Sequence, residues 1–267
     1  MAFEGTFHWT AAQLSGPGLY LSDLHAGRDA EADQDLRGLL HWLTADDRGY
    51  RWLCWGGDIF DFLAAGNRVS LGRTLWVLDA MRALAARGVQ QYLIEGNHDF
   101  HLGFLAREVP GLVVVPDGLR DVSAGVALVH GDWHTAGGLY GPMRRVFRSR
   151  WLAGALARGP HGLIDAVAQT WSRTSHEVRG GPPEPEYLAF VAQRFHRILA
   201  QDPQCQLWLS GHVHWPARIQ QGGATCYING EWAVHRTVME VPGDGTVRYC
   251  LWQAAGLQPY AHALAEL

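Results

Sequence analysis

The stretch SGHVHWPA at residues 210–217 directly follows an apolar run, QLWL at residues 206–209, that is typical of a buried strand. His212 and His214 flank a single valine at the point where this strand is expected to end. Two imidazoles placed so close together are typical of a metal site, although a histidine pair alone is weak support for one. The residues at the ends of the other predicted strands therefore decide the interpretation.

Four more predicted strands, at residues 18–23, 51–58, 89–97 and 126–132, also end in residues that can bind metals. Taken alone, each fragment has an ordinary interpretation as a solvated or capping pair, a Gly-Asn turn or a hydrogen-bonded histidine. The carboxyl ends of strands meet at one edge in open α/β folds, so their joint occurrence predicts a single site. The strand ends supply Asp23 and His25, then Asp58 and Asp61, then Asn97, His98 and Asp99, and finally His130.

The chemistry of this set narrows the choice of metal. Oxygen and nitrogen ligands without a thiolate suit a hydrolytic transition-metal site that holds manganese, iron or zinc. Asp23 and His25 lie two residues apart, so in extended chain both side chains are expected to point to the same side.

Predicted strands alternate with predicted helices at residues 34–47, 74–88 and 186–200, and the last third of the chain is rich in short strands. This order predicts an α/β sandwich of two sheets with outer helices, formed by a single domain over residues 1–267. Residues 134–184 break the alternation, because they offer helical segments without a good strand and end in the turn-forming sequence RGGPPEPE. We interpret residues 134–184 as a helical insertion.

The composition excludes several classes of protein. The 267 residues carry a net charge of −4 with 48% hydrophobic residues, which is ordinary for a soluble globular protein and disfavours a nucleic-acid partner. No run of 18 apolar residues is present, and the N-terminus lacks the pattern of a signal peptide. Four scattered cysteines favour the reducing cytoplasm. All 22 basic residues are arginines, so a cationic phosphate contact must come from arginine, histidine or a metal.

Five sequence blocks together resemble the calcineurin-like metallophosphoesterases: SDLH, GGDIFD, EGNHD, VHGD and SGHVH, between residues 22 and 214. The resemblance implies a four-layer αββα sandwich and two divalent metal ions, with manganese expected first and iron or zinc as alternatives. One ion would be held by Asp23, His25, Asp58 and His214, and the other by Asp58, Asn97, His130 and His212.

Such a pair of ions clamps phosphoryl oxygens and lowers the pKa of a bridging water, so that hydroxide attacks phosphorus. Asp58, as the shared ligand, and His98 are the expected catalytic residues. His98 is not needed as a ligand and is free to donate a proton or stabilise charge. Asp61 is expected to hold a ligating histidine, and Asp99 either orients His98 or is a solvated carboxylate.

The insertion carries seven arginines and only two acidic residues through residue 183, interleaved with aromatic and aliphatic residues. It is either an ordinary helical hairpin with its apolar side on the core, or an apolar groove for acyl chains with arginines for phosphate and anionic lipid headgroups. The insertion resembles the lid of the UDP-2,3-diacylglucosamine hydrolases of lipid A biosynthesis, and YINGEW at residues 227–232 is similar to a late strand-turn of that family. The resemblance implies substrate contacts from Tyr140, Arg144, Trp151, Arg173 and Ser175.

This second resemblance implies cleavage of the pyrophosphate of a lipid-linked nucleotide sugar, UDP-2,3-diacylglucosamine, to UMP and 2,3-diacylglucosamine 1-phosphate. We then expect a cytoplasmic monomer with peripheral contact to the anionic cytoplasmic face of the inner membrane. His98 stands where well-known members of that family carry arginine. The alternatives are a metallophosphoesterase acting on a soluble nucleotide, a phosphoprotein or a small phosphate ester, and a non-catalytic scaffold.

Overall fold

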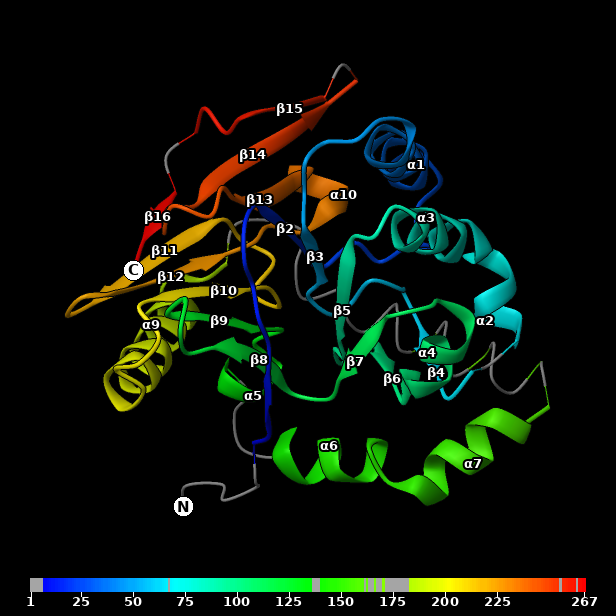
Figure 1. The fold of residues 1–267 in the computed structure, drawn as a ribbon. Coiled ribbons are helices and arrows are strands. Elements are labelled where there is room, and N and C mark those ends of the chain that lie inside the picture. The colour runs from blue at the N-terminus through cyan, green and yellow to red at the C-terminus, as the bar shows by residue number, and fades with distance from the viewer. Residues whose placement is uncertain are drawn as a thin grey trace.

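The computed structural model describes residues 7–66, 68–135, 140–160, 162, 166, 170, 183–254, 256–262 and 264–267. Two seven-stranded sheets dominate the fold (Figure 1). The first sheet has the order β1 (Trp9–Ala11), β8 (Gly118–Asp121), β9 (Val126–Val129), β10 (Leu207–Ser210), β12 (Ala224–Ile228), β11 (Ala217–Gln221) and β16 (Ala265–Glu266). The second has the order β15 (Gly256–Pro259), β14 (Arg248–Gln253), β13 (Thr237–Val241), β2 (Gly18–Leu21), β3 (Trp52–Trp55), β5 (Gln90–Ile94) and β7 (Val113–Val115).

The strands that precede the sequence motifs run parallel to one another in each sheet. In the second sheet β2, β3, β5 and β7 run parallel, and in the first sheet β10 runs parallel to both β9 and β12. A small third sheet pairs β4 (Leu63–Ala64) with β6 (Asp99–Phe100). The helices are α1 (Ala30–Ala45), α2 (Arg68–Arg73), α3 (Leu75–Ala86), α4 (Leu105–Glu108), α5 (Asp132–Thr135), α6 (Tyr140–Phe147), α7 (Arg150–Arg158), α9 (Pro185–Gln201) and α10 (Trp232–His235), with a 3-10 turn at Leu102–Phe104.

Successive side chains of the central strands point alternately to the outer helices and to the space between the two sheets, which separates the four layers. In β2, Leu19 and Leu21 join the cluster that contains the buried faces of α1 and α3, whereas Tyr20 lies in the cluster between the sheets. In β10, Leu207 and Leu209 face that inner cluster, whereas Trp208 packs with residues of α9. Successive strand residues point to opposite faces, so both sheets are buried on both sides. The predicted αββα sandwich is therefore confirmed (Figure 1).

The outer helices form where an apolar stripe meets a capping signal. In α1, Leu36, Leu39, Leu40 and Leu43 are buried at helical spacing, and the Asp29 side chain caps the helix by accepting a hydrogen bond from the Ala32 amide at 2.8 Å. Each predicted helix is present, with ends that differ by a few residues from the expected ones. No helix in the described ranges is both long and apolar enough to cross a membrane.

The strands are shorter than the sequence predicted. β2 ends at Leu21, β3 at Trp55, β5 at Ile94 and β9 at Val129, so the polar residues of the motifs lie on the loops that follow. In the insertion, the described residues form α6 and α7, which lie beside the sandwich along its lower edge in Figure 1.

Candidate metal centre

The loops after five strands converge at the carboxyl ends of the parallel strands. Asp23 follows β2, Asp58 follows β3, Asn97 follows β5, His130 follows β9, and the turn with His212 and His214 follows β10. β2, β3 and β5 are neighbours in one sheet, while β9 and β10 are neighbours in the other. The site therefore lies where the edges of the two sheets meet.

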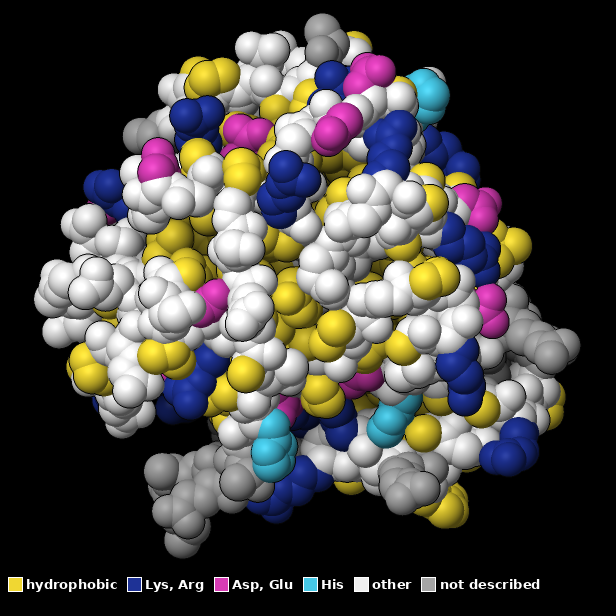
Figure 2. All heavy atoms as spheres, viewed as in Figure 1, with side chains coloured by type: hydrophobic (Ala, Val, Ile, Leu, Met, Phe, Trp, Pro, Cys, Tyr) yellow, Lys and Arg dark blue, Asp and Glu magenta, His cyan; other side chains and the backbone are white. Residues whose placement is uncertain are grey.

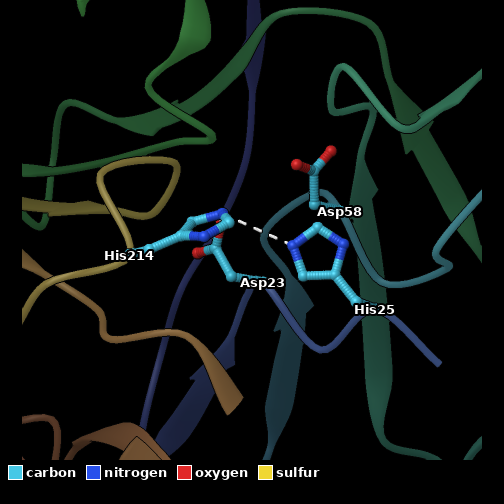
Figure 3. Close-up of side chains that lie close together, drawn as sticks. All are labelled: Asp23, His25, Asp58 and His214. Atoms are coloured by element: carbon cyan, nitrogen blue, oxygen red, sulfur yellow. Dashed lines mark hydrogen bonds and ion pairs between the residues drawn. The ribbon is translucent and has the colours of Figure 1, made fainter. Parts of the chain in front are cut away.

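Asp23, His25, Asp58 and His214 form the first ligand group, and each offers a ligand atom within 4.8 Å of the others (Figure 3). The Nε2 atoms of His25 and His214 are 3.4 Å apart, and Nε2 of His214 is 3.2 Å from Oδ1 of Asp23. All four residues are buried. Two carboxylates and two imidazoles facing one another form a donor set that suits a divalent cation.

Asp58, His130 and His212 form a second cluster of the same kind, which shares Asp58 with the first. Nε2 of His130 is 3.4 Å from Oδ2 of Asp58 and 3.2 Å from Oδ1 of Asn97. We name Asp58, Asn97, His130 and His212 the second ligand group. The structure thus brings all seven predicted ligand residues together, with Asp58 between the two groups.

Hydrogen bonds orient some ligand side chains of the site, and other buried polar atoms there have no hydrogen-bond partner in the described part of the chain that could compete with a cation. Nδ1 of His130 donates to the Gly56 carbonyl at 3.1 Å, which turns Nε2 toward Asp58 and Asn97. Among the described residues, Nδ1 of His25 and Oδ2 of Asp58 are buried and make no hydrogen bond. Buried polar atoms left in this way are costly unless an ion or water satisfies them. The residues present therefore fit a divalent metal site.

The electrostatics put His25 and Asp58 in their metal-binding forms, whereas at His130 the neighbouring Asp58 outweighs burial and raises the pKa to about 10, so this ring must lose a proton to bind a metal. Burial, with the neighbouring imidazole of His98, lowers the pKa of His25 well below its usual value, so this ring is neutral. Burial alone would raise the pKa of Asp58, but the adjacent His130 and His98 hold it well below the ordinary range. Neutral imidazole and ionised carboxylate are the forms that bind metals.

The ligand loops have unusual backbone conformations. Eight non-glycine residues in the described part of the chain have positive φ, and five of them belong to the ligand groups: Asp23, His25, Asp58, His212 and His214. Asp23 and His25 do reach the same ligand group, but the expected extended conformation is wrong, because their φ values are 54° and 46°. Each non-glycine residue in this region costs about 1–2 kcal/mol, and such strain concentrates at functional sites.

Asp99 binds the backbone of the metal-binding loops, a role that neither sequence-based interpretation included. Its carboxylate is fully buried and accepts hydrogen bonds from the backbone amides of Asp58 (3.0 Å), Ile59 (2.6 Å), Phe60 (3.2 Å) and Gly96 (2.9 Å). Both earlier interpretations, an orienting partner of the His98 ring and a solvated carboxylate, are replaced by this one. Asp99 holds the loop that carries Asp58 against the loop that carries Asn97.

His98 lies beside the first ligand group. Its backbone amide donates to Oδ1 of Asp58 at 2.8 Å, and its ring centroid is 4.7 Å from that of His25. Nδ1 of His98 donates to the backbone carbonyl of Asp61 at 2.7 Å, which fixes the orientation of the ring. The Asp61 carboxylate also clusters with His25 and His98, in the neighbourhood expected for a residue that supports a histidine.

Glu231 and Arg28 lie next to the first ligand group, although the sequence did not predict them as site residues. Oε2 of Glu231 is 3.4 Å from Nδ1 of the ligand-group residue His214, and Oε1 accepts from Arg28 at 2.6 Å. Glu231 is 5% exposed, so this chain of contacts is shielded from water. Glu231 belongs to the YINGEW stretch, where the only available signal was an acidic residue directly before a tryptophan.

The predicted substrate contacts have mixed outcomes. Arg144 is 9% exposed and pairs with Asp117 at 2.6 Å and Asp132 at 3.1 Å, so its guanidinium is committed to the protein itself. Trp151, in contrast, is 80% exposed on α7. Tyr140 begins α6, but its side chain, together with Arg173 and Ser175, lies outside the described residues.

Known proteins resemble this chain in sequence and, more distantly, in structure. A family model described as calcineurin-like phosphoesterase matches residues 19–216, a segment that contains every residue of both ligand groups. A UDP-2,3-diacylglucosamine hydrolase of Aeromonas hydrophila is 26% identical over 228 residues, covering 83% of this chain and 92% of that protein. Proteins of the same name from Aeromonas salmonicida and Xanthomonas campestris are 29% and 27% identical, each over 85% of this chain and over 90% and 96% of their own length. A crystal structure of a predicted phosphoesterase from Streptococcus pneumoniae covers 94% of this chain and 95% of its own, with 11% identity and a TM-score of 0.43.

Proposed function

We propose that this chain, which belongs to the calcineurin-like phosphoesterase family, hydrolyses the pyrophosphate bond of UDP-2,3-diacylglucosamine to give UMP and 2,3-diacylglucosamine 1-phosphate, a step of lipid A biosynthesis. That the chain is a metal-dependent phosphoester hydrolase follows from its family and from its hydrolase relatives. The observation that carries the reaction type is the pair of ligand groups that share Asp58. The observation that favours the substrate is the likeness to three hydrolases of that name across most of the chain.

The first ligand group would hold one divalent ion and the second ligand group the other, with Asp58 between them. Two such ions neutralise charge on the phosphoryl oxygens and make hydroxide available at neutral pH. Manganese is the first choice for this set of carboxylates, imidazoles and one amide, with iron or zinc as alternatives. All seven residues come from loops after neighbouring strand ends, so the chain holds its ligands in place before a substrate arrives.

His98 is the proposed proton donor to the leaving group. It is nearly fully buried, it contacts the first ligand group through its neighbour His25, and its Nδ1 is fixed by the Asp61 carbonyl. A ring held at one nitrogen presents the other in a defined direction, which is what general acid catalysis needs.

The outer surface of the insertion supports peripheral membrane contact. Met143, Val146 and Trp151 are 43%, 58% and 80% exposed on α6 and α7, and exposed arginines accompany them. In Figure 2, arginine and hydrophobic side chains lie side by side along the lower edge, where Figure 1 places these helices. Apolar residues beside cations favour an anionic lipid surface.

The function is tested with the purified protein, Mn²⁺ and two substrates. One is UDP-2,3-diacylglucosamine in mixed micelles, with UMP release measured by chromatography, and the other is a small chromogenic phosphodiester. We expect a kcat/KM for the lipid substrate at least about 100-fold above that for the small ester, since remote binding energy is available only to the former. An Asp58→Ala variant is expected to lose both activities and both metal equivalents.

A second candidate function is a phosphoesterase of soluble substrates. It is favoured by Arg144, whose guanidinium is paired with Asp117 and Asp132 and is therefore withdrawn from phosphate binding. Turnover of the small ester without UMP release from the lipid would select this candidate. If a protein with two bound Mn²⁺ hydrolysed neither substrate, the result would point to the non-catalytic scaffold.

A further inference from the structure

Arg144 of α6 and Arg148, the residue that directly follows α6, reach from the insertion into the body of the protein. Arg144 pairs with Asp117 through Nη2 at 2.6 Å and with Asp132 through Nε at 3.1 Å. One turn later, Nη1 of Arg148 pairs with Glu95 at 2.6 Å and also donates to the Pro116 carbonyl at 2.6 Å. Nη2 of Arg148 donates to the backbone carbonyls of Glu95 at 3.2 Å and Gly96 at 3.4 Å. We call Arg144, Arg148, Glu95, Asp117 and Asp132 the arginine clasp.

The acidic partners of the arginine clasp stand beside the second ligand group. Asp132 lies two residues after His130, and Glu95 lies two residues before Asn97. The turn with His212 is tied to the same place, because the Gly211 amide donates to the His130 carbonyl at 2.8 Å. Arg144 and Arg148 therefore each hold a loop that carries one ligand of the second group.

The charges make this attachment strong. Three carboxylates face two guanidinium groups, and the side chains of Asp117, Asp132 and Glu95 are only 4–8% exposed. Removing the arginines would leave carboxylates buried and unpaired, which is costly even after the protein relaxes. The unpaired carboxylates could regain hydration only if their loops moved toward water. Such movement would displace the neighbouring His130 and Asn97.

We propose that the seating of α6 through the arginine clasp and the binding of a divalent ion by the second ligand group are coupled. Arg144 and Arg148 act as positioning residues, because they touch the ligand loops rather than the ion. The coupling rests on the proposed pair of ions and does not depend on the identity of the substrate. Coupling free energies are reciprocal, so a seated α6 tightens ion binding and a bound ion tightens α6.

Both directions are measurable with Mn²⁺ alone. Hydrogen–deuterium exchange followed by mass spectrometry reports the protection of α6, residues 140–147, with and without Mn²⁺. An electron paramagnetic resonance titration reports how many Mn²⁺ ions bind and how tightly. In the wild type we expect two ions and slower exchange of α6 when both are bound. In Arg144→Met we expect faster exchange of α6, loss of its response to Mn²⁺, and an affinity for one of the two ions reduced by about 10–100-fold.

Arg145 gives the matched control, since it is the next residue of the same helix and its side chain is exposed. Arg145→Met is expected to match the wild type in both measurements. If Arg144→Met does not fold, Arg144→Lys replaces it, because lysine keeps the charge but cannot span two carboxylates with a rigid fork. Asp117→Asn adds a variant that weakens the clasp away from the ligand loops, with an intermediate effect expected in the same direction.

A folded Arg144 variant that binds two Mn²⁺ with wild-type affinity and keeps the response of α6 to Mn²⁺ would overturn the coupling while leaving the metal pair intact. A wild-type protein that binds a single ion would instead overturn the proposed metal pair, and the coupling with it. The two failures are therefore distinguished by the wild-type titration.

Discussion

Asp99→Asn tests whether the carboxylate of Asp99 holds the metal-binding loops in place. One oxygen of this buried side chain accepts from the amides of Asp58 and Gly96, and the other accepts from the amides of Ile59 and Phe60. Asparagine has the same shape but only one accepting oxygen, and its amino group donates. Whichever way the new side chain turns, two backbone amides face another donor.

The size of the effect follows from this count. A buried donor that loses its acceptor costs about 1–3 kcal/mol, so two of them cost about 2–6 kcal/mol. The free energy of unfolding of a typical domain is only about 5–15 kcal/mol, so the loss is a large fraction of the total. The loop that moves also carries Asp58, and we therefore expect the affinity for Mn²⁺ to fall by about 10–100-fold.

Urea unfolding followed by tryptophan fluorescence gives the stability, and a Mn²⁺ titration gives the affinity. Asp79→Asn is the matched control, because Asp79 is 70% exposed and its pair with Arg82 is a surface contact. The control is expected to change the free energy of unfolding by less than about 0.5 kcal/mol. If Asp99→Asn unfolds within about 1 kcal/mol of the wild type and binds Mn²⁺ normally, the supporting role of Asp99 is refuted.

Three further changes test other parts of the molecule. Glu231→Gln removes the charge between Arg28 and His214, and the Mn²⁺ dissociation constant is expected to rise by about 10–100-fold in a titration, with no rise arguing against a supporting role. Tyr20→Phe removes the hydrogen bond of 2.7 Å from the Tyr20 hydroxyl to the Val129 carbonyl across the two sheets, and urea unfolding is expected to show a loss of about 0.5–1.5 kcal/mol. Trp151→Ala is expected to weaken co-sedimentation with anionic vesicles while changing stability by less than about 0.5 kcal/mol, and unchanged sedimentation would contradict membrane contact through α7.

The sandwich was predictable from the sequence because its strands and helices are strongly patterned. The apolar runs at residues 18–21 and 207–209 are buried on both faces, and the leucines of α1 recur at helical spacing. Among the strands that were missed, β1 and β7 have only three residues each, and β8 has the sequence GLRD, which has no apolar run. β1 and β7 are strands because each pairs at the edge of a sheet, and β8 because it lies between β1 and β9.

The gathering of the ligand residues was also predictable, but their conformation was not. Parallel neighbours end at the same edge, so residues after β2, β3 and β5 must meet whatever their loops do. The positive φ of Asp23 and His25 depends on the second sheet and its neighbouring loop, because the Asp23 amide donates to the Gly57 carbonyl and the His25 amide donates to the Asp58 carbonyl, both at 3.0 Å. No local pattern in the sequence contains that information.

Arg144 shows why a surplus of arginines is a poor guide to a phosphate site. Its acidic partners Asp117 and Asp132 are 27 and 12 residues earlier in the chain, and only the fold brings them under α6. The insertion has few acids of its own, so its charge suggested an anionic substrate when part of that charge is used to attach the insertion to the protein. A charge excess in one segment has meaning only after the carboxylates of the segments packed against it are known.

The ligand loops are joined to one another by backbone hydrogen bonds. The Gly211 amide reaches the His130 carbonyl at 2.8 Å, and the Trp232 amide reaches the Asp23 carbonyl at 3.0 Å, so neither bond involves a ligand atom. The second of these bonds holds the strained conformation of Asp23, and a bond of 3.2 Å from the Glu231 amide to the His214 carbonyl holds that of His214. The proposed ions would offset the repulsion between the buried carboxylates of Asp23 and Asp58, and under the proposed coupling their binding energy would act on the ligand loops and, through the arginine clasp, on α6.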